Sequence, residues 1–330
     1  MEPLPVGVVG VGHLGSLHTK MLTQISAVRL VGVTDIDNAR AEKKALEFST
    51  KAFRSVDELL AHVKAIVIAT PTSVHFDVAR LAIEKNIHVF VEKPITSTVE
   101  QARILVEEAK KHRTVIQVGH IERFNPAILA LEKYRLNPMF IESHRLAQFN
   151  PRGTDIAVVL DLMIHDIDII LSLVRSPVEK IEANGIPVVS DTVDIANARL
   201  QFANGCVANV TASRISQKKM RKMRLFQRDA YISVDFSEGL SEVFRLVDVD
   251  AEAVVPTMML GEIELGASKR KIVYEQPPVK EVNALQYELE LFADAVRTGK
   301  APLVTGEDGL HALEVAHKIM EKIRQQKLSL

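Results

Sequence analysis

The chain has few of the features that mark several common protein classes. It holds one cysteine, Cys206, which excludes an intramolecular disulfide and a cysteine-based zinc module and fits a reducing compartment. Its 41 basic residues nearly balance its 42 acidic ones, so the basic excess of a nucleic-acid binder is missing. No apolar run approaches the roughly 18 residues that a membrane span needs, and no basic segment precedes the first apolar run. We therefore expect a globular cytoplasmic protein with no membrane or nucleic-acid partner.

Short, β-branched apolar runs alternate with amphipathic stretches over the first 120 residues. The continuous runs are typical of strands that are buried on both faces, and they lie at 6–11, 28–33, 65–69, 87–91 and 115–118. Ser55 with Glu58, and Thr98 with Gln101, form capping boxes at which helices begin. The alternation predicts a Rossmann-type, doubly wound parallel sheet with helices on both faces, over residues 1–122.

After about residue 140 the apolar residues follow a period of two. The pair Asn204-Gly205 separates two such segments, which is the strongest short signal of a β-hairpin. Two helices are expected at the end of the chain, near 283–297 and 307–326. We predict that residues 123–330 form a second domain, a mostly antiparallel β-sheet flanked by helices. We leave residues 250–270 unassigned.

The predicted strands of the second domain carry apolar residues on both alternations. Val207, Ala208 and Val210 are examples from one strand. Because exposed apolar sheet is usually covered by a partner, we expect a homodimer or homotetramer formed through this sheet.

A glycine-rich turn follows the first predicted strand and leads directly into a helical pattern. In the run Gly10-Val11-Gly12-His13-Leu14-Gly15, the first glycine permits a tight turn, the second leaves room for a pyrophosphate, and the third lets helix and strand approach closely. Asp35 lies 20 residues after Gly15, at the end of the next strand, where a carboxylate binds the ribose hydroxyls and repels a 2′-phosphate. This predicts NAD rather than NADP; the alternative is a glycine turn without a ligand.

Lys93 lies in Glu92-Lys93-Pro94, immediately after a predicted parallel strand. Ligands bind at the carboxyl ends of such strands, so this lysine is a candidate for the cofactor cleft. The alternative is a solvated lysine at a strand end.

Residues 155–174 form an apolar helical pattern interrupted by polar residues on one face. Asp161 lies one α-helical turn before His165, and Asp168 shares their face. Three interpretations stay open: a buried structural pair, a metal site, or general acid–base chemistry, which we favour because histidine is the commonest proton-transfer group near neutral pH. No zinc-type spacing supports the metal site, so we expect no metal.

Taken together, four segments are similar to those of the Gfo/Idh/MocA oxidoreductases: 10–15, Ala69-Thr70-Pro71, Glu92-Lys93-Pro94 and Asp161-x-x-x-His165-Asp166-x-Asp168. The resemblance covers the first half of the chain, and the β-rich second half suits that family's substrate-binding domain. It implies that Lys93 and His165 flank the reacting carbon of a sugar and that Asp161 is a partner of the substrate or of His165. It also implies four residues around the nicotinamide ribose, namely Thr70, Pro71, His75 and Glu92.

A narrower resemblance, to the UDP-N-acetylglucosamine 3-dehydrogenases of that family, rests on residues 117–126. His120 and Arg123 in this segment are expected near the cleft. Arg145 and Arg152 are further candidates for binding a pyrophosphate, because arginine pairs bidentately with phosphate oxygens. The alternative for each arginine is an ordinary ion pair.

The sequence therefore predicts an NAD-dependent dehydrogenase that acts on a secondary hydroxyl of a sugar, most simply a nucleotide sugar. One alternative is a dehydrogenase of a free polyol such as inositol, which would not need the arginines. Another is a non-catalytic NAD-binding regulator, against which the set of Lys93, Asp161 and His165 argues.

Overall fold

The computed structural model describes residues 2–150, 154, 156–248, 258–265 and 268–326. The chain divides into two units, the first made of Met1–Ile121 with Val282–Glu314 and the second of Glu122–Glu281 with Val315–Leu330. Each unit has its own sheet. In the described part of the chain, no helix is long and apolar enough to cross a membrane.

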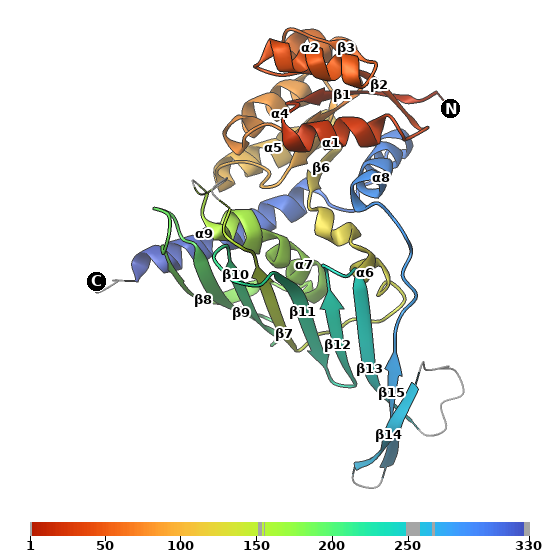
Figure 1. Cartoon of the computed structure of the whole chain (residues 1–330), viewed down its shortest axis with the longest axis vertical. Coiled ribbons are helices and arrows are strands. Elements are labelled where there is room, and N and C mark those ends of the chain that lie inside the picture. Colours follow the sequence, from red (N-terminus) through yellow and green to blue (C-terminus); the bar gives the residue numbers. More distant parts are fainter. Residues whose placement is uncertain (1, 151–153, 155, 249–257, 266–267, 327–330) are drawn as a thin grey trace. The chain divides into compact units, whose positions relative to one another are not determined.

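The first unit contains a six-stranded parallel sheet in the order β3-β2-β1-β4-β5-β6 (Figure 1). Its strands are β1 (Leu4–Val9), β2 (Val28–Thr34), β3 (Lys51–Ala52), β4 (Ala65–Ile68), β5 (His88–Glu92) and β6 (Ile116–Gly119). The reversal of strand order beside β1 is the switch point of a doubly wound sheet, where ligands bind outside the carboxyl ends of the strands. The predicted fold of this part is confirmed.

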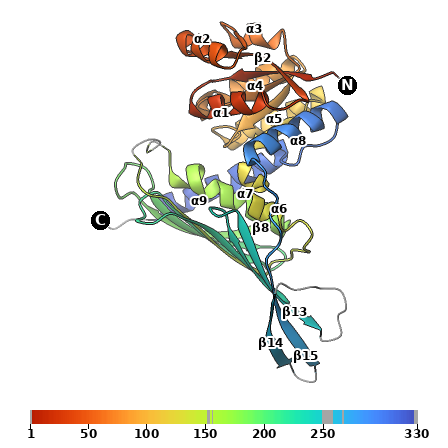
Figure 2. The same ribbon diagram turned by 45° about the vertical axis from the view of Figure 1, so that its right-hand side comes forward.

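Helices cover both faces of this sheet. They are α1 (His13–Leu22), α2 (Asn38–Glu47), α3 (Val56–Leu60), α4 (His75–Glu84) and α5 (Val99–His112), with a 3-10 turn η1 (Thr72–Val74) and the late helix α8 (Ala284–Thr298). The side chains of Ser55 and Thr98 accept the amide protons of Glu58 and Gln101, each at 3.2 Å, so both predicted helix starts are confirmed. In both views α1 and α8 lie side by side (Figures 1 and 2).

The second unit is built on a nine-stranded sheet in the order β14-β15-β13-β12-β11-β7-β10-β9-β8. Its strands are β7 (Phe140–Leu146), β8 (Val178–Ile186), β9 (Ile195–Phe202), β10 (Val207–Ser213), β11 (Met220–Gln227), β12 (Ala230–Asp235), β13 (Leu240–Asp248), β14 (Met258–Leu265) and β15 (Ser268–Glu275). The pair β7 and β10 is parallel and the other pairs are antiparallel. This confirms the predicted, mostly antiparallel sheet. Gly205, at φ 85°, turns the chain between β9 and β10, as the hairpin signal predicted.

The helices of the second unit lie on one side of its sheet (Figure 2). They are the 3-10 turn η2 (Ile121–Phe124), α6 (Pro126–Leu129), the π-helical turn η3 (Val159–Met163), α7 (Ile164–Val174) and the end of α9 (Gly306–Gln325). Along β10, Ala208, Val210 and Ala212 are fully buried and alternate with half-buried residues, so one face of the sheet forms the core. On the half-exposed face, aromatic rings with centroids 5.1–5.7 Å apart form a row across five strands: Phe140, Phe226, Tyr231, Phe244 and Tyr274.

The predicted boundary at residue 122 lies one residue from the first division between the units, but the predicted second domain also included residues 282–314. The structure groups those residues with the first unit. Leu289, Phe292 and Ala293 of α8 are buried in the same core as β1 and α1, and the ring of Phe292 lies edge-on to Phe90 of β5. Sequence periodicity shows that α8 has an apolar face but not which sheet buries it.

Candidate functional site

The glycine-rich turn between β1 and α1 has the geometry of a dinucleotide-binding loop. Gly10 has φ 85°, which favours glycine, and a Cβ atom there would lie 2.8 Å from the carbonyl oxygen of Ala69. A Cβ at Gly15 would lie 1.8 Å from the carbonyl oxygen of Gly10, so helix and turn can pack only with glycine. A Cβ at Gly12 would meet nothing within 4 Å, which leaves the start of α1 open to a phosphate. His13 and Leu14 are exposed beside it.

Asp35 follows β2 and lies against the same turn. Its Oδ2 accepts the amide proton of Val11 at 2.8 Å, and its Oδ1 accepts that of Asp37 at 3.0 Å. The half-exposed guanidinium of Arg40 lies 3.4 Å from Oδ1. This brings the predicted ribose-binding carboxylate to the edge of the glycine turn, so the residues of the first unit fit an NAD molecule with its pyrophosphate at the start of α1.

Lys93 directly follows β5, at the carboxyl ends of the parallel strands, where Asp35 also lies. Both Glu92 and Lys93 are half-buried. The peptide bond between Lys93 and Pro94 is cis. Glu92 is held by His18 of α1, whose Nε2 donates to Oε1 at 2.6 Å. Burial alone would raise the pKa of Glu92, but the hydrogen bond from His18 and the charges of His18 and Lys93 lower it below its usual value.

Thr70 lies beside the glycine turn, and His75 lies beside Lys93-Pro94, the segment directly after β5 that we call the lysine turn. Thr70 is half-buried next to Gly10, and Pro71 is exposed. His75 is 1% exposed, with Nδ1 3.0 Å from the carbonyl oxygen of Pro94 and Nε2 2.9 Å from that of Thr70. Burial lowers its pKa, although both carbonyls act in the opposite direction. The ring thus links the loops that follow β4 and β5, and its contact with a cofactor stays a prediction.

In the second unit, the predicted helix over 155–174 is interrupted at its start. Asp161 lies in the π-helical turn η3, and His165 lies in the first turn of the α-helix α7. Asp161 and His165 therefore do not lie on one uninterrupted α-helix, as the sequence pattern assumed, and the role of Asp161 as a partner of His165 stays a prediction. Such π-helical turns occur frequently at functional sites. Asp161 and His165 are both half-buried.

Arg123 and Arg145 each form ion pairs with buried carboxylates in the second unit. Arg123 binds Asp168 through Nε at 2.8 Å and a terminal nitrogen at 2.7 Å. Arg145, which is 4% exposed, binds both oxygens of Asp166 and also contacts Glu122 at 2.9 Å. Both arginines therefore have the ion pairs that the alternative interpretation expected, and their binding of a phosphate stays a prediction.

The remaining predicted residues give less information. His120 follows β6 and is fully buried. Arg152 lies outside the described residues. Within the described ranges, no group of three or more histidine, cysteine or acidic side chains is arranged to hold a metal ion.

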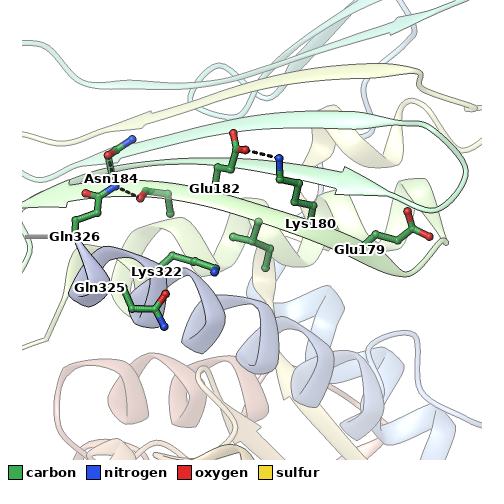
Figure 3. Close-up of a pocket in the computed structure, with 9 residues that line it drawn as sticks. Glu179, Lys180, Glu182, Asn184, Lys322, Gln325 and Gln326 are labelled. Atoms are coloured by element: carbon green, nitrogen blue, oxygen red, sulfur yellow. Dashed lines mark hydrogen bonds and ion pairs between the residues drawn. The ribbon is translucent and has the colours of Figure 1, made fainter.

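A groove of about 500 Å³ lies between β8 and the last turns of α9 in the second unit (Figure 3). Its polar lining includes Glu179, Lys180, Glu182, Lys322 and Gln325. None of the predicted site residues lines it.

Sequence reasoning missed His18. It is a fully buried histidine on an otherwise amphipathic helix. Nothing in the sequence around His18 indicates that its partner is Glu92, which lies 74 residues further along the chain.

Comparison with family models matches both halves of the chain. Residues 4–120 match the oxidoreductase family with an NAD-binding Rossmann fold. Residues 135–239 match the GFO/IDH/MocA C-terminal domain.

The chain is 42% identical over 245 residues to UDP-N-acetylglucosamine 3-dehydrogenase of Acidithiobacillus ferrooxidans. The matched segment covers 74% of this chain and 78% of that protein. The chain is 30% identical to scyllo-inositol 2-dehydrogenase (NAD(+)) of Bacillus subtilis, over 93% of this chain and 90% of that one. A solved structure of UDP-N-acetylglucosamine 3-dehydrogenase from A. ferrooxidans superposes with a TM-score of 0.86 and 35% identity, covering 98% of both chains.

Proposed function

Because the chain belongs to the Gfo/Idh/MocA family of NAD-binding oxidoreductases, we propose that it oxidises a secondary hydroxyl of a nucleotide sugar, with UDP-N-acetylglucosamine as the first candidate substrate. The observation that carries this proposal is the 42% identity to a UDP-N-acetylglucosamine 3-dehydrogenase, supported by the TM-score of 0.86 over nearly the whole of both chains.

Residues of the first unit would hold the cofactor. The start of α1, opened by Gly12, would bind the pyrophosphate, and Asp35 would accept hydrogen bonds from the ribose hydroxyls. His13, Leu14, Thr70 and Pro71 would line the dinucleotide. Bound NAD supplies the hydride acceptor.

Lys93 and His165 would act on the sugar hydroxyl. A half-buried imidazole is suited to take the hydroxyl proton as the carbon is oxidised, and a lysine ammonium can stabilise the developing oxyanion. Asp161 would assist as a partner of His165 or of the substrate. The proposal requires Lys93 and His165 to reach the same carbon of the substrate.

A free polyol is the second candidate substrate. It is favoured by the 30% identity to an NAD-dependent inositol dehydrogenase over more than nine-tenths of this chain. It is also favoured by the ion pairs of Arg123 and Arg145, which already occupy donors that a pyrophosphate would use. A non-catalytic regulator has no feature of its own in its favour.

The test is a substrate panel with NAD, read by the absorbance of the reduced cofactor. UDP-N-acetylglucosamine, UDP-glucose, myo-inositol and glucose form the panel, and UDP alone is added as a competitor. Turnover of a UDP-sugar, with inhibition by UDP, supports the proposal. Turnover of inositol or glucose, with no inhibition by millimolar UDP, establishes the polyol alternative instead.

The proposal also includes a cytoplasmic location, where NAD is available, and a homodimer or homotetramer. The half-exposed aromatic row on the sheet of the second unit supports self-association, since a second copy would cover it.

A further inference from the structure

A fully buried histidine and a half-buried carboxylate connect the cofactor-binding helix to the turn that carries Lys93. His18 lies on α1, the helix that begins directly after the glycine turn, and its side chain is fully buried. Its Nε2 lies 2.6 Å from Oε1 of Glu92, the last residue of β5. A single contact therefore joins the element that would bind the pyrophosphate to the residue immediately before Lys93.

The carboxylate of Glu92 is fixed on its other side as well. Its Oε2 accepts the amide proton of Lys93 at 3.2 Å. On the neighbouring strand β6, a Cβ atom at Gly119 would lie 3.1 Å from this oxygen, so glycine leaves the space that the carboxylate fills. The ring of His18 also lies edge-on to Phe90, with centroids 5.3 Å apart. These contacts leave the carboxylate little freedom to move.

We propose that His18 and Glu92 are positioning residues for Lys93, and that they transmit the position of the cofactor-binding helix to the lysine turn. His18 is too deeply buried to meet a sugar, so it would act through Glu92. Positioning matters because a reacting group displaced by about 1 Å can lose on the order of 100-fold in rate. This inference rests on the proposed function, in which Lys93 acts on the substrate.

The test compares three variants. His18→Leu removes the donor, and His18→Gln keeps an N–H group that can reach Glu92. Thr19→Val is the matched control, because Thr19 is an equally buried neighbour on α1 whose hydroxyl bonds to the carbonyl oxygen of Gly15 at 2.6 Å and not to Glu92.

Steady-state kinetics use whichever sugar the wild type oxidises. We expect His18→Leu to lower kcat by about 10- to 100-fold, with the NAD dissociation constant nearly unchanged and a larger isotope effect when the reacting C–H is deuterated. His18→Gln should recover most of kcat, and Thr19→Val should resemble the wild type. Equal loss of kcat and NAD affinity in His18→Leu, or failure of His18→Gln to recover activity, overturns the proposal.

A second readout needs neither substrate nor cofactor. The free protein is treated with acetic anhydride, and mass spectrometry compares the acetylation rate of Lys93 with that of the exposed Lys85. If the lysine turn is released from Glu92 in His18→Leu, Lys93 should be acetylated about threefold faster than in the wild type. This ratio corresponds to a free-energy change of about 0.7 kcal/mol. An unchanged ratio contradicts the positioning role. If the wild type oxidises no sugar, the proposed function fails while this labelling still decides the role of His18.

Discussion

The guanidinium of Arg145 on β7 and the carboxylate of Asp166 on α7 form a two-point ion pair inside the second unit. Nε lies 2.8 Å from Oδ2, and a terminal nitrogen lies 3.0 Å from Oδ1. The other terminal nitrogen binds Glu122, which also pairs with Arg221. Arg145 thereby ties the sheet to the helix that carries His165.

Replacing Arg145 with methionine should destabilise the protein strongly. It leaves the buried carboxylates of Asp166 and Glu122 without this partner, a loss that typically costs about 3–5 kcal/mol. Urea unfolding followed by circular dichroism measures it. The control is Arg224→Met, which breaks the more exposed pair with Glu142 and should cost about 0–1 kcal/mol. A variant at Arg145 that keeps full stability but loses UDP inhibition would favour the phosphate-binding role instead.

Asp35 should determine the choice of cofactor. We expect the wild type to bind NAD more tightly than NADP, and Asp35→Ala to weaken NAD by about 10- to 150-fold, the value of a hydrogen bond to a charged group. The same change removes the repulsion of a 2′-phosphate and leaves Arg40 beside it, so the preference should move toward NADP. Calorimetric titration with both cofactors measures this. Tighter binding of NADP by the wild type would show the assignment to be wrong.

Removing Lys93 or His165 should affect turnover far more than cofactor binding. Alanine at either position should lower kcat by about 100- to 10,000-fold, the usual contribution of a general acid or base. Lys85→Ala, at an exposed surface ion pair with Asp57, is the matched control and should keep full activity. If His165→Ala stays within a few-fold of the wild type, the structural interpretation of this histidine is correct.

A charged residue in the aromatic row should break the proposed assembly. We expect the wild type to sediment as a dimer or tetramer, and Phe226→Asp, at a ring that is 36% exposed, to shift it toward the 36.6 kDa monomer. Leu46→Asp, at an 83% exposed position on α2, is the control and should leave the assembly intact. A wild type that sediments as one species of 36.6 kDa at micromolar concentration would exclude the interface.

Stability should fall in mild acid because of His75. Its pKa in the folded protein is lowered by burial, so the unfolded chain binds the proton first, near pH 6.5. The free energy of unfolding should therefore decrease as the pH falls from about 7 through 6.5. His75→Gln should make this slope shallower, and His62→Gln, at an exposed histidine, should not. Equal slopes in the three proteins would contradict the assignment.

Local signals in the sequence were enough to predict the elements that need only their own residues. The β-branched runs located five strands of the parallel sheet, although they missed the two-residue strand β3. Asn204-Gly205 located a hairpin, because strand burial and a positive φ at glycine are local properties. The glycine turn and Asp35 were found together for the same reason, since β1, α1 and β2 are consecutive.

Partners distant in sequence could not be predicted in the same way. Nothing near Arg145 indicates Asp166, and nothing near His18 indicates Glu92, because each pairing depends on how separate elements pack. The π turn at Asp161 was missed because apolar periodicity assumes a constant number of residues per turn. The sequence also could not show that α8 belongs to the first unit, because its apolar face fits either sheet.

The late position of α8 has a consequence for synthesis on the ribosome. The strands and helices of the first unit up to residue 121 emerge first, yet Leu289 and Phe292, which complete their core, are made after the whole sheet of the second unit. Until then, the apolar surface that Phe292 covers beside Phe90 stays exposed on the nascent chain. A chain that ends after residue 281 should therefore carry a first unit that proteases cut readily, and a chain that also contains residues 282–314, free of the ribosome, should be protected.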